Sequence, residues 1–156
     1  MQRRHLIVGG AGALLASRAF AHHGWSSFDQ DRPIWLEGKA VKVAWGNPHV
    51  EIDLQVPPDL KLPSDLAQRP VPAQAAGVDS QRLLAAARLP TRRDPVWEIE
   101  FAPLTRMEAW KVPPIKVGDS IAVLGFTLVG EKGDAVLRAE YLFAGAKTYG
   151  MRSAPA

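Results

Sequence analysis

The stretch Val50-Glu51-Ile52-Asp53-Leu54-Gln55-Val56 decides the fold class, because apolar and polar side chains alternate along it without interruption. A period of two places the apolar residues on one face of a β-strand and the polar residues on the other. The same alternation returns at residues 97–101 and 137–143. Residues 36–45 and 120–128 are apolar but less regular, and the second segment is apolar on both faces, as in a strand that is covered on both sides. We therefore predict five β-strands.

The connections between these segments favour one architecture. Gly46-Asn47-Pro48 predicts a tight bend, and residues 130–134 predict a hairpin loop between the last two strands. Thr105-Arg106-Met107-Glu108 has the pattern of a capping box and predicts a short helix between the third and fourth strands. This order is the plan of an OB-fold. The prediction is an all-β fold: a small five-stranded, OB-fold-like Greek-key barrel with one short helix.

Residues 57–95 interrupt the pattern. They contain seven of the 13 prolines and a single helical candidate, near residues 79–88. We expect a mobile or loosely docked excursion between the second and third strands, because the segment has few apolar residues of its own. The predicted organisation is a cleaved signal peptide (1–21), an N-terminal arm (22–35), a barrel domain (36–147) that includes the excursion, and a flexible C-terminal tail (148–156).

The first 21 residues have the three parts of a secretory signal. Two arginines, Arg3 and Arg4, precede a short apolar run, and Ala19-Phe20-Ala21 matches an A-x-A cleavage site. The apolar run is shorter than the roughly 20 residues that span a bilayer, so we expect no membrane span in the mature chain. The protein is predicted to be periplasmic or secreted after cleavage at Ala21. The sequence leaves open whether export follows the general or the twin-arginine route.

Removal of this signal changes the charge of the chain. Three of the 19 basic residues leave with it and no acidic residue does, so 16 basic side chains face 16 acidic ones. The remaining chain has no basic stripe, and we expect no nucleic-acid partner. Cysteine is absent, which excludes disulfides and thiolate metal sites.

Three histidines are the main chemical clue. Cleavage after Ala21 would make His22 the first residue, and its α-amine and imidazole could then chelate one metal ion together with His23. A set of imidazole and amine nitrogens favours copper(II). His49 follows the predicted bend at the loop between strands one and two, a usual binding surface of OB-folds. The competing interpretation is that a terminal His-His pair binds copper loosely without any function, and that His49 only stabilises its turn.

No catalytic apparatus is recognisable. The chain has no G-x-S-x-G, P-loop or H-E-x-x-H motif. The acidic pairs Glu51/Asp53 and Glu98/Glu100 are expected on solvated strand faces, and Trp45 and Trp97 are expected in the core. We predict that the protein is not an enzyme; a copper redox enzyme is the less favoured alternative.

Several motifs together resemble a family of small exported bacterial proteins of unknown function. The family reads His-His after the signal, W-x-N-P-H, and a strand of the form G-D-x-V-x-V-x-G, and the chain departs from it at Gly24-Trp25, at Ala109-Trp110 and in its longer excursion. The resemblance implies a periplasmic location but no activity. In this chain the motifs stand at His22-His23, at Trp45-Gly46-Asn47-Pro48-His49, and at residues 118–125.

The sequence thus predicts a periplasmic binding module that holds a copper-type ion through His22, His23 and His49. The alternative is an interaction domain for a small molecule, a glycan or a protein, with no metal. It would use the exposed barrel face around Asn47, Glu51 and Asp53.

Overall fold

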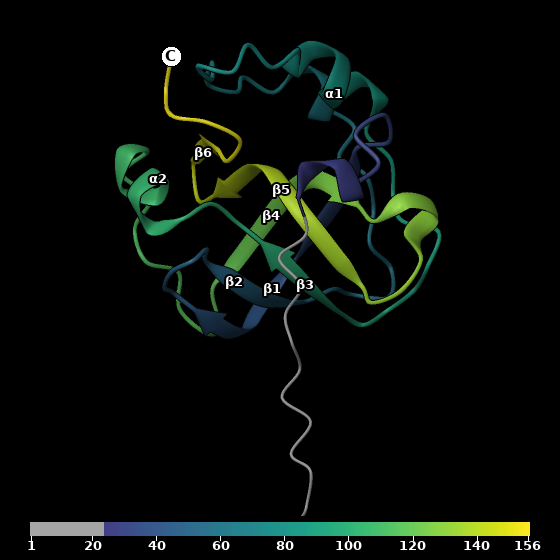
Figure 1. Ribbon diagram of the computed structural model, residues 1–156. Helices are drawn as coiled ribbons and strands as arrows, with labels where there is room; N and C mark the ends of the chain where they lie inside the picture. The colour runs from purple at the N-terminus through teal and green to yellow at the C-terminus, as the bar shows by residue number, and fades with distance from the viewer. Residues whose placement is uncertain (1–23) are drawn as a thin grey trace, which may run out of the picture.

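The computed structural model describes residues 24–156 (Figure 1). Six strands and two short α-helices, with three single 3-10 turns, make up its regular structure. The strands are β1 (Ile34–Ala44), β2 (Glu51–Gln55), β3 (Val96–Glu100), β4 (Ser120–Thr127), β5 (Val136–Ala144) and β6 (Lys147–Gly150), the helices are α1 (Ser80–Ala86) and α2 (Leu104–Ala109), and the 3-10 turns are η1 (Trp25–Ser27), η2 (Leu66–Gln68) and η3 (Val129–Glu131).

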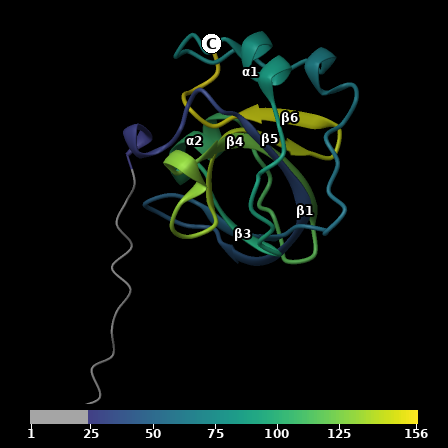
Figure 2. The ribbon, with the colours of Figure 1, turned by 90° about the vertical axis from the view of Figure 1, so that its right-hand side faces the viewer.

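The first five strands form a closed barrel. β1 pairs with β2 and with β4, β2 pairs with β3, and β4 pairs with β5, all antiparallel. A parallel pairing of β3 with β5 closes the ring, which Figure 2 shows from the side. The helix α2 lies between β3 and β4 in the chain. The prediction of a small all-β, OB-fold-like barrel is therefore confirmed.

Alternation along the strands builds the barrel interior. Ile52 and Leu54 on β2 face Ile99 and Trp97 on β3, and all four side chains are buried. Trp97 lies in the core as predicted, whereas Trp45 is half-buried and packs against the edge of the core. Each such side chain contributes about 1.5–3 kcal/mol through burial.

A glycine on β4 permits a close approach between the backbones of β4 and β5. A Cβ atom on Gly125 of β4 would lie 2.2 Å from the carbonyl oxygen of Arg138 on β5. No side chain fits there, and the register of the two strands shifts at this residue. The last glycine of the G-D-x-V-x-V-x-G pattern is thus required for close backbone approach.

A second hydrophobic cluster covers the outer face of β4 and β5. Trp35, Leu124, Phe126 and Tyr141 point outward from the barrel and are nevertheless buried. The covering side chains include Leu66, Leu83 and Leu84, which come from the excursion at residues 57–95. The excursion therefore packs against the barrel, in contrast to the expected loose loop. It needs few apolar residues because the sheet supplies the other half of the cluster.

Polar contacts fix the start of α1 and the end of the excursion. Asp79 caps α1 by accepting a hydrogen bond from the backbone N–H of Arg82. The helix α2 forms where it was predicted, but it begins after Pro103 without a side-chain cap, so the predicted capping box at Thr105 is wrong. The buried carboxylate of Glu131 accepts hydrogen bonds from the backbone N–H groups of Thr91 and Arg92. Burial alone would raise the pKa of Glu131, but these hydrogen bonds and the Arg32 guanidinium together lower it.

The C-terminal segment is also packed against the barrel, where a flexible tail was expected. β6 pairs with β5, and Glu140 of β5 is completely buried beneath it. Arg152 donates from Nε and Nη2 to Glu140 at 2.8 and 2.7 Å, and Gln74 of the excursion donates to the same carboxylate at 2.8 Å. The Gln74 amide oxygen accepts in turn from the backbone N–H of Arg152 and Ser153. Barrel, excursion and C-terminal segment therefore share one buried polar network.

Replacing Arg152 with methionine should destabilise the whole fold. Arg152→Met leaves the Glu140 carboxylate buried without its countercharge, which typically costs 3–5 kcal/mol. Urea unfolding monitored by circular dichroism measures the change. The matched control is Lys42→Met. Lys42 is exposed, and its Nζ lies 3.9 Å from the Asp53 carboxylate, so the loss of this surface ion pair should cost less than about 1 kcal/mol. Similar losses for the two variants would contradict a buried ionic clamp.

Candidate functional site

His49 lies at the end of the bend that joins β1 to β2. The bend contains a cis peptide bond between Asn47 and Pro48, and the Asn47 side-chain oxygen accepts a hydrogen bond from the backbone N–H of Leu104. The His49 side chain is 10 % exposed, and its Nδ1 lies 3.4 Å from Oε1 of Glu51. A hollow of about 460 Å³ adjoins both residues. His49, two residues before the start of the same face of β2, therefore lies beside Glu51.

The outward faces of β2 and β3 together form an acidic strip, defined by Glu51, Asp53, Glu98 and Glu100. Antiparallel pairing places Glu51 opposite Glu100 and Asp53 opposite Glu98. Like charges on directly opposed residues repel each other. Burial, and then the negative charges of Glu51, Glu100 and Asp53, raise the pKa of Glu98 above its ordinary value. The Glu98 carboxyl group therefore holds a proton more readily than an ordinary glutamate does.

One end of the strip is not solvated, contrary to expectation. Glu100 is only 4 % exposed, and Arg138 of β5 donates to its carboxylate at 3.1 Å. The expectation assumed that an outward-facing side chain on β3 would meet water. The parallel neighbour β5 instead brings Arg138 directly beside Glu100.

The N-terminal arm reaches the barrel beside this ion pair. The centre of the Trp25 ring lies 5.1 Å from the guanidinium group of Arg138 and 4.1 Å from that of Arg152. It also meets Phe126 of β4 edge-on, with 6.3 Å between ring centres. The following residues are held to the end of β4, where Asp29 donates its backbone N–H to Thr127 at 2.9 Å. Trp25 is thus an anchor point for the arm on the outward face of β4 and β5.

The predicted site residues are placed only in part. His22 and His23 lie outside the described residues, and within residues 24–156 no three His, Cys, Asp or Glu side chains are grouped as metal ligands. The structure brings His49 and Glu51 together and puts Asp53 on the same face. The sequence reasoning missed Trp25 and Arg138. The pairing of the two acidic strands would have indicated the strip, had the register been known.

Relief of the charge repulsion within the strip should stabilise the protein. Glu98→Gln is expected to raise the free energy of unfolding at neutral pH by about 0.5 kcal/mol, the size of one cross-strand charge pair. The folded-state pKa of Glu98 lies above its unfolded value, so ionisation of Glu98 costs stability as the pH rises through that interval. The benefit of the variant should therefore vanish as the pH falls through the same interval. Thermal unfolding between pH 3 and 8 checks this, and a benefit that is constant with pH would contradict it.

No helix within residues 24–156 is long and apolar enough to span a membrane.

Comparison with known proteins gives one match. No curated protein and no solved structure matches the chain. Residues 12–61, a part that includes η1, β1, His49 and β2, match the model of a "Family of unknown function (DUF6152)". This match confirms the predicted resemblance to a family of unknown function.

Proposed function

We propose that the mature protein is an exported, non-enzymatic binding module that holds copper(II) through His22, His23 and His49. The observation that carries the proposal is the anchoring of Trp25 beside Arg138, which is the register partner of Glu100 at one end of the acidic strip. In this view the compartment is periplasmic or extracellular, and cleavage after Ala21 creates the terminal amine of His22.

The separation of Arg138 and Glu51 across the sheet is similar to the length of chain between His22 and Trp25. Arg138, Glu100 and Glu51 are register partners on three neighbouring strands, β5, β3 and β2. Neighbouring strands lie about 4.8 Å apart, so Glu51 is about 10 Å from Arg138 across the sheet. The two residues between His22 and Trp25 span up to roughly 10 Å of extended chain. An extended arm that starts at Trp25 and follows these strands would therefore bring His22 and His23 toward the Glu51 end of the acidic strip, two residues from His49.

The donor set suits copper(II). An α-amine and imidazole nitrogens are ligands that copper(II) prefers, and copper(II) stands at the top of the divalent affinity series. A metal-bound histidine commonly directs its second ring nitrogen to a carboxylate. The Glu51 carboxylate lies 3.4 Å from Nδ1 of His49 and would take this role when a metal is bound, which leaves Nε2 as the nitrogen that would bind the metal. The negative charges of Asp53 and Glu98 add a favourable field for a cation.

Copper(II) affinity tests the proposal directly. Protein that begins at His22 should bind one equivalent tightly, and His49→Ala should weaken binding at least a hundredfold, roughly 2.7 kcal/mol. Calorimetry with a competing chelator measures both affinities, and circular dichroism verifies that the variant is folded. An extra glycine before His22 should also weaken binding, because it displaces the terminal amine. Weak binding that is indifferent to His49 would instead favour the metal-free alternative, an interaction domain that uses the face around Asn47, Glu51 and Asp53.

The anchor residue gives a second, more specific prediction. Trp25→Ala frees the arm from the barrel and lowers the effective concentration of its histidines near His49. Copper(II) affinity should fall about tenfold, or 1.4 kcal/mol, whereas Trp25→Phe keeps an aromatic ring beside the two arginines and should retain most of the affinity. Equal affinities for Trp25→Ala and the parent protein would refute the role of the anchor.

A further inference from the structure

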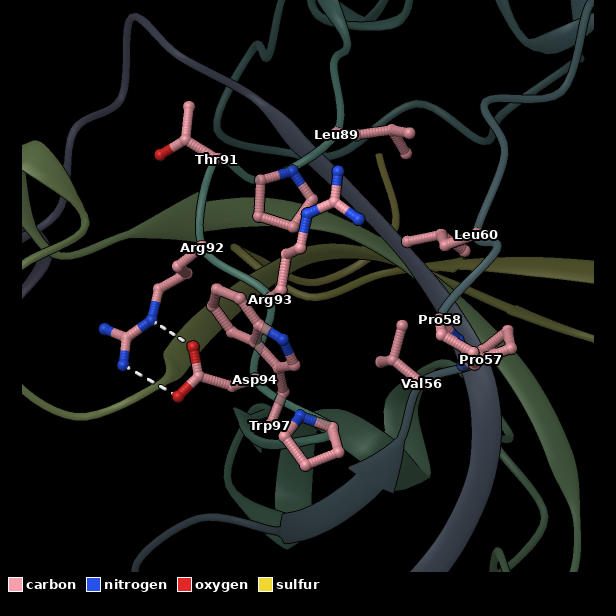
Figure 3. Close-up of a pocket in the computed structure, with 12 residues that line it drawn as sticks. Val56, Pro57, Pro58, Leu60, Leu89, Thr91, Arg92, Arg93, Asp94 and Trp97 are labelled. Carbon is pink, nitrogen blue, oxygen red and sulfur yellow. Dashed lines mark hydrogen bonds and ion pairs between the residues drawn. The ribbon is translucent and has the colours of Figure 1, made fainter.

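A groove of about 640 Å³ lies at the opposite end of β2 from His49 (Figure 3). One wall is the segment that leaves β2, and the other is the segment that leads into β3. Its volume falls within the range of pockets that enclose small organic ligands. Its apolar surface is formed by Val56, Pro57, Leu60, Leu89, Pro90 and Trp97.

The walls of the groove are built to keep their shape. Four prolines, at positions 57, 58, 90 and 95, line it, and each fixes its own backbone φ angle. Trp97 is only 1 % exposed and belongs to the barrel core, so this part of the groove rests on packed core side chains. A preformed apolar groove pays little ordering entropy when a ligand enters.

Two arginines line the groove, and they differ in their partners. The Arg92 guanidinium is bound to the Asp94 carboxylate and to the backbone oxygens of Glu131 and Gly133. Arg93 is exposed, and within residues 24–156 its guanidinium has no hydrogen bond or ion pair. Figure 3 shows the Arg93 side chain extended across the groove, toward Leu89. Since the charges of Arg92 and Asp94 neutralise each other, the positive charge of Arg93 is the one uncompensated charge among the residues that line the groove.

We propose that this groove binds a small amphipathic monoanion: an apolar ring or branched chain with a single carboxylate. The apolar body would lie against Leu60, Leu89 and Trp97. The carboxylate would accept two hydrogen bonds from the paired N–H groups of the Arg93 guanidinium. A guanidinium fork matches a carboxylate in both shape and charge. The site is separate from His49 and does not rest on the copper proposal.

The experiment compares two ligands that differ only in charge. Naphthalene-2-carboxylate and the neutral 2-naphthalenemethanol have the same ring system, and each is titrated into ¹⁵N-labelled protein that begins at His22. We expect the carboxylate to shift the indole N–H signal of Trp97 and the backbone amide signals of residues 91–94, with an affinity at least tenfold above that of the alcohol.

Variants assign the charge selectivity to one residue. Arg93→Gln should lower the affinity for the carboxylate about tenfold, to that of the alcohol, and should leave the alcohol unaffected. The matched control is Arg82→Gln, at an exposed arginine on α1 that is not part of the groove, and it should change neither affinity. Equal affinities of the two ligands, an Arg93→Gln variant that still prefers the carboxylate, shifts located outside the groove, or no binding at millimolar concentration would each overturn the proposal.

Discussion

The outer face of β4 and β5 bears Leu124, Phe126 and Tyr141, and these side chains must be kept from water as fully as those inside the barrel. This requirement explains the most unusual part of the chain. The excursion between β2 and β3 supplies the missing half of a second hydrophobic cluster, and the network of Glu140, Arg152 and Gln74 joins it to the C-terminal segment. Because a buried carboxylate is costly without its partners, the three elements depend on one another for stability.

This cover divides the outside of the barrel into an apolar side that is covered and a charged side that carries the acidic strip. β4 and β5 are hidden beneath the excursion, whereas β2 and β3 carry the acidic strip, in which Glu51, Asp53 and Glu98 are half-buried and Glu100 is buried. Trp25 lies at the boundary, where its ring meets Phe126 on one side and the arginines on the other. The covered side thus provides the contacts that anchor Trp25 beside Arg138 and Arg152. The groove at residues 89–97 lies at the far end of β2, so one fold holds two chemically different surfaces.

The strands were predictable because a barrel strand with one buried face must alternate, and β2 and β3 do so. The unbroken apolar run in β4 likewise indicated cover on both faces, and the excursion provides that cover. What covers β4 could not be predicted, because Leu83, Leu84 and Gln74 make contacts over long sequence separations that leave no local pattern. The burial of Glu100 was missed for a related reason: it depends on the parallel pairing with β5, which brings Arg138 beside it. At the site, the strand phase of His49 and Glu51 was predictable, but the anchor at Trp25 was not.

The central functional claim is that the arm and His49 form one site on the barrel, and the paramagnetism of copper(II) tests this claim most directly. One equivalent of copper(II) is added to ¹⁵N-labelled protein that begins at His22, and the broadening of amide signals is mapped onto the structure. The account predicts strong broadening for residues 49–53 and 98–100, with residues 57–60 at the far end of β2 left sharp. Broadening confined to residues 22–27 would show that the terminal histidines bind copper(II) on their own, and would contradict the account.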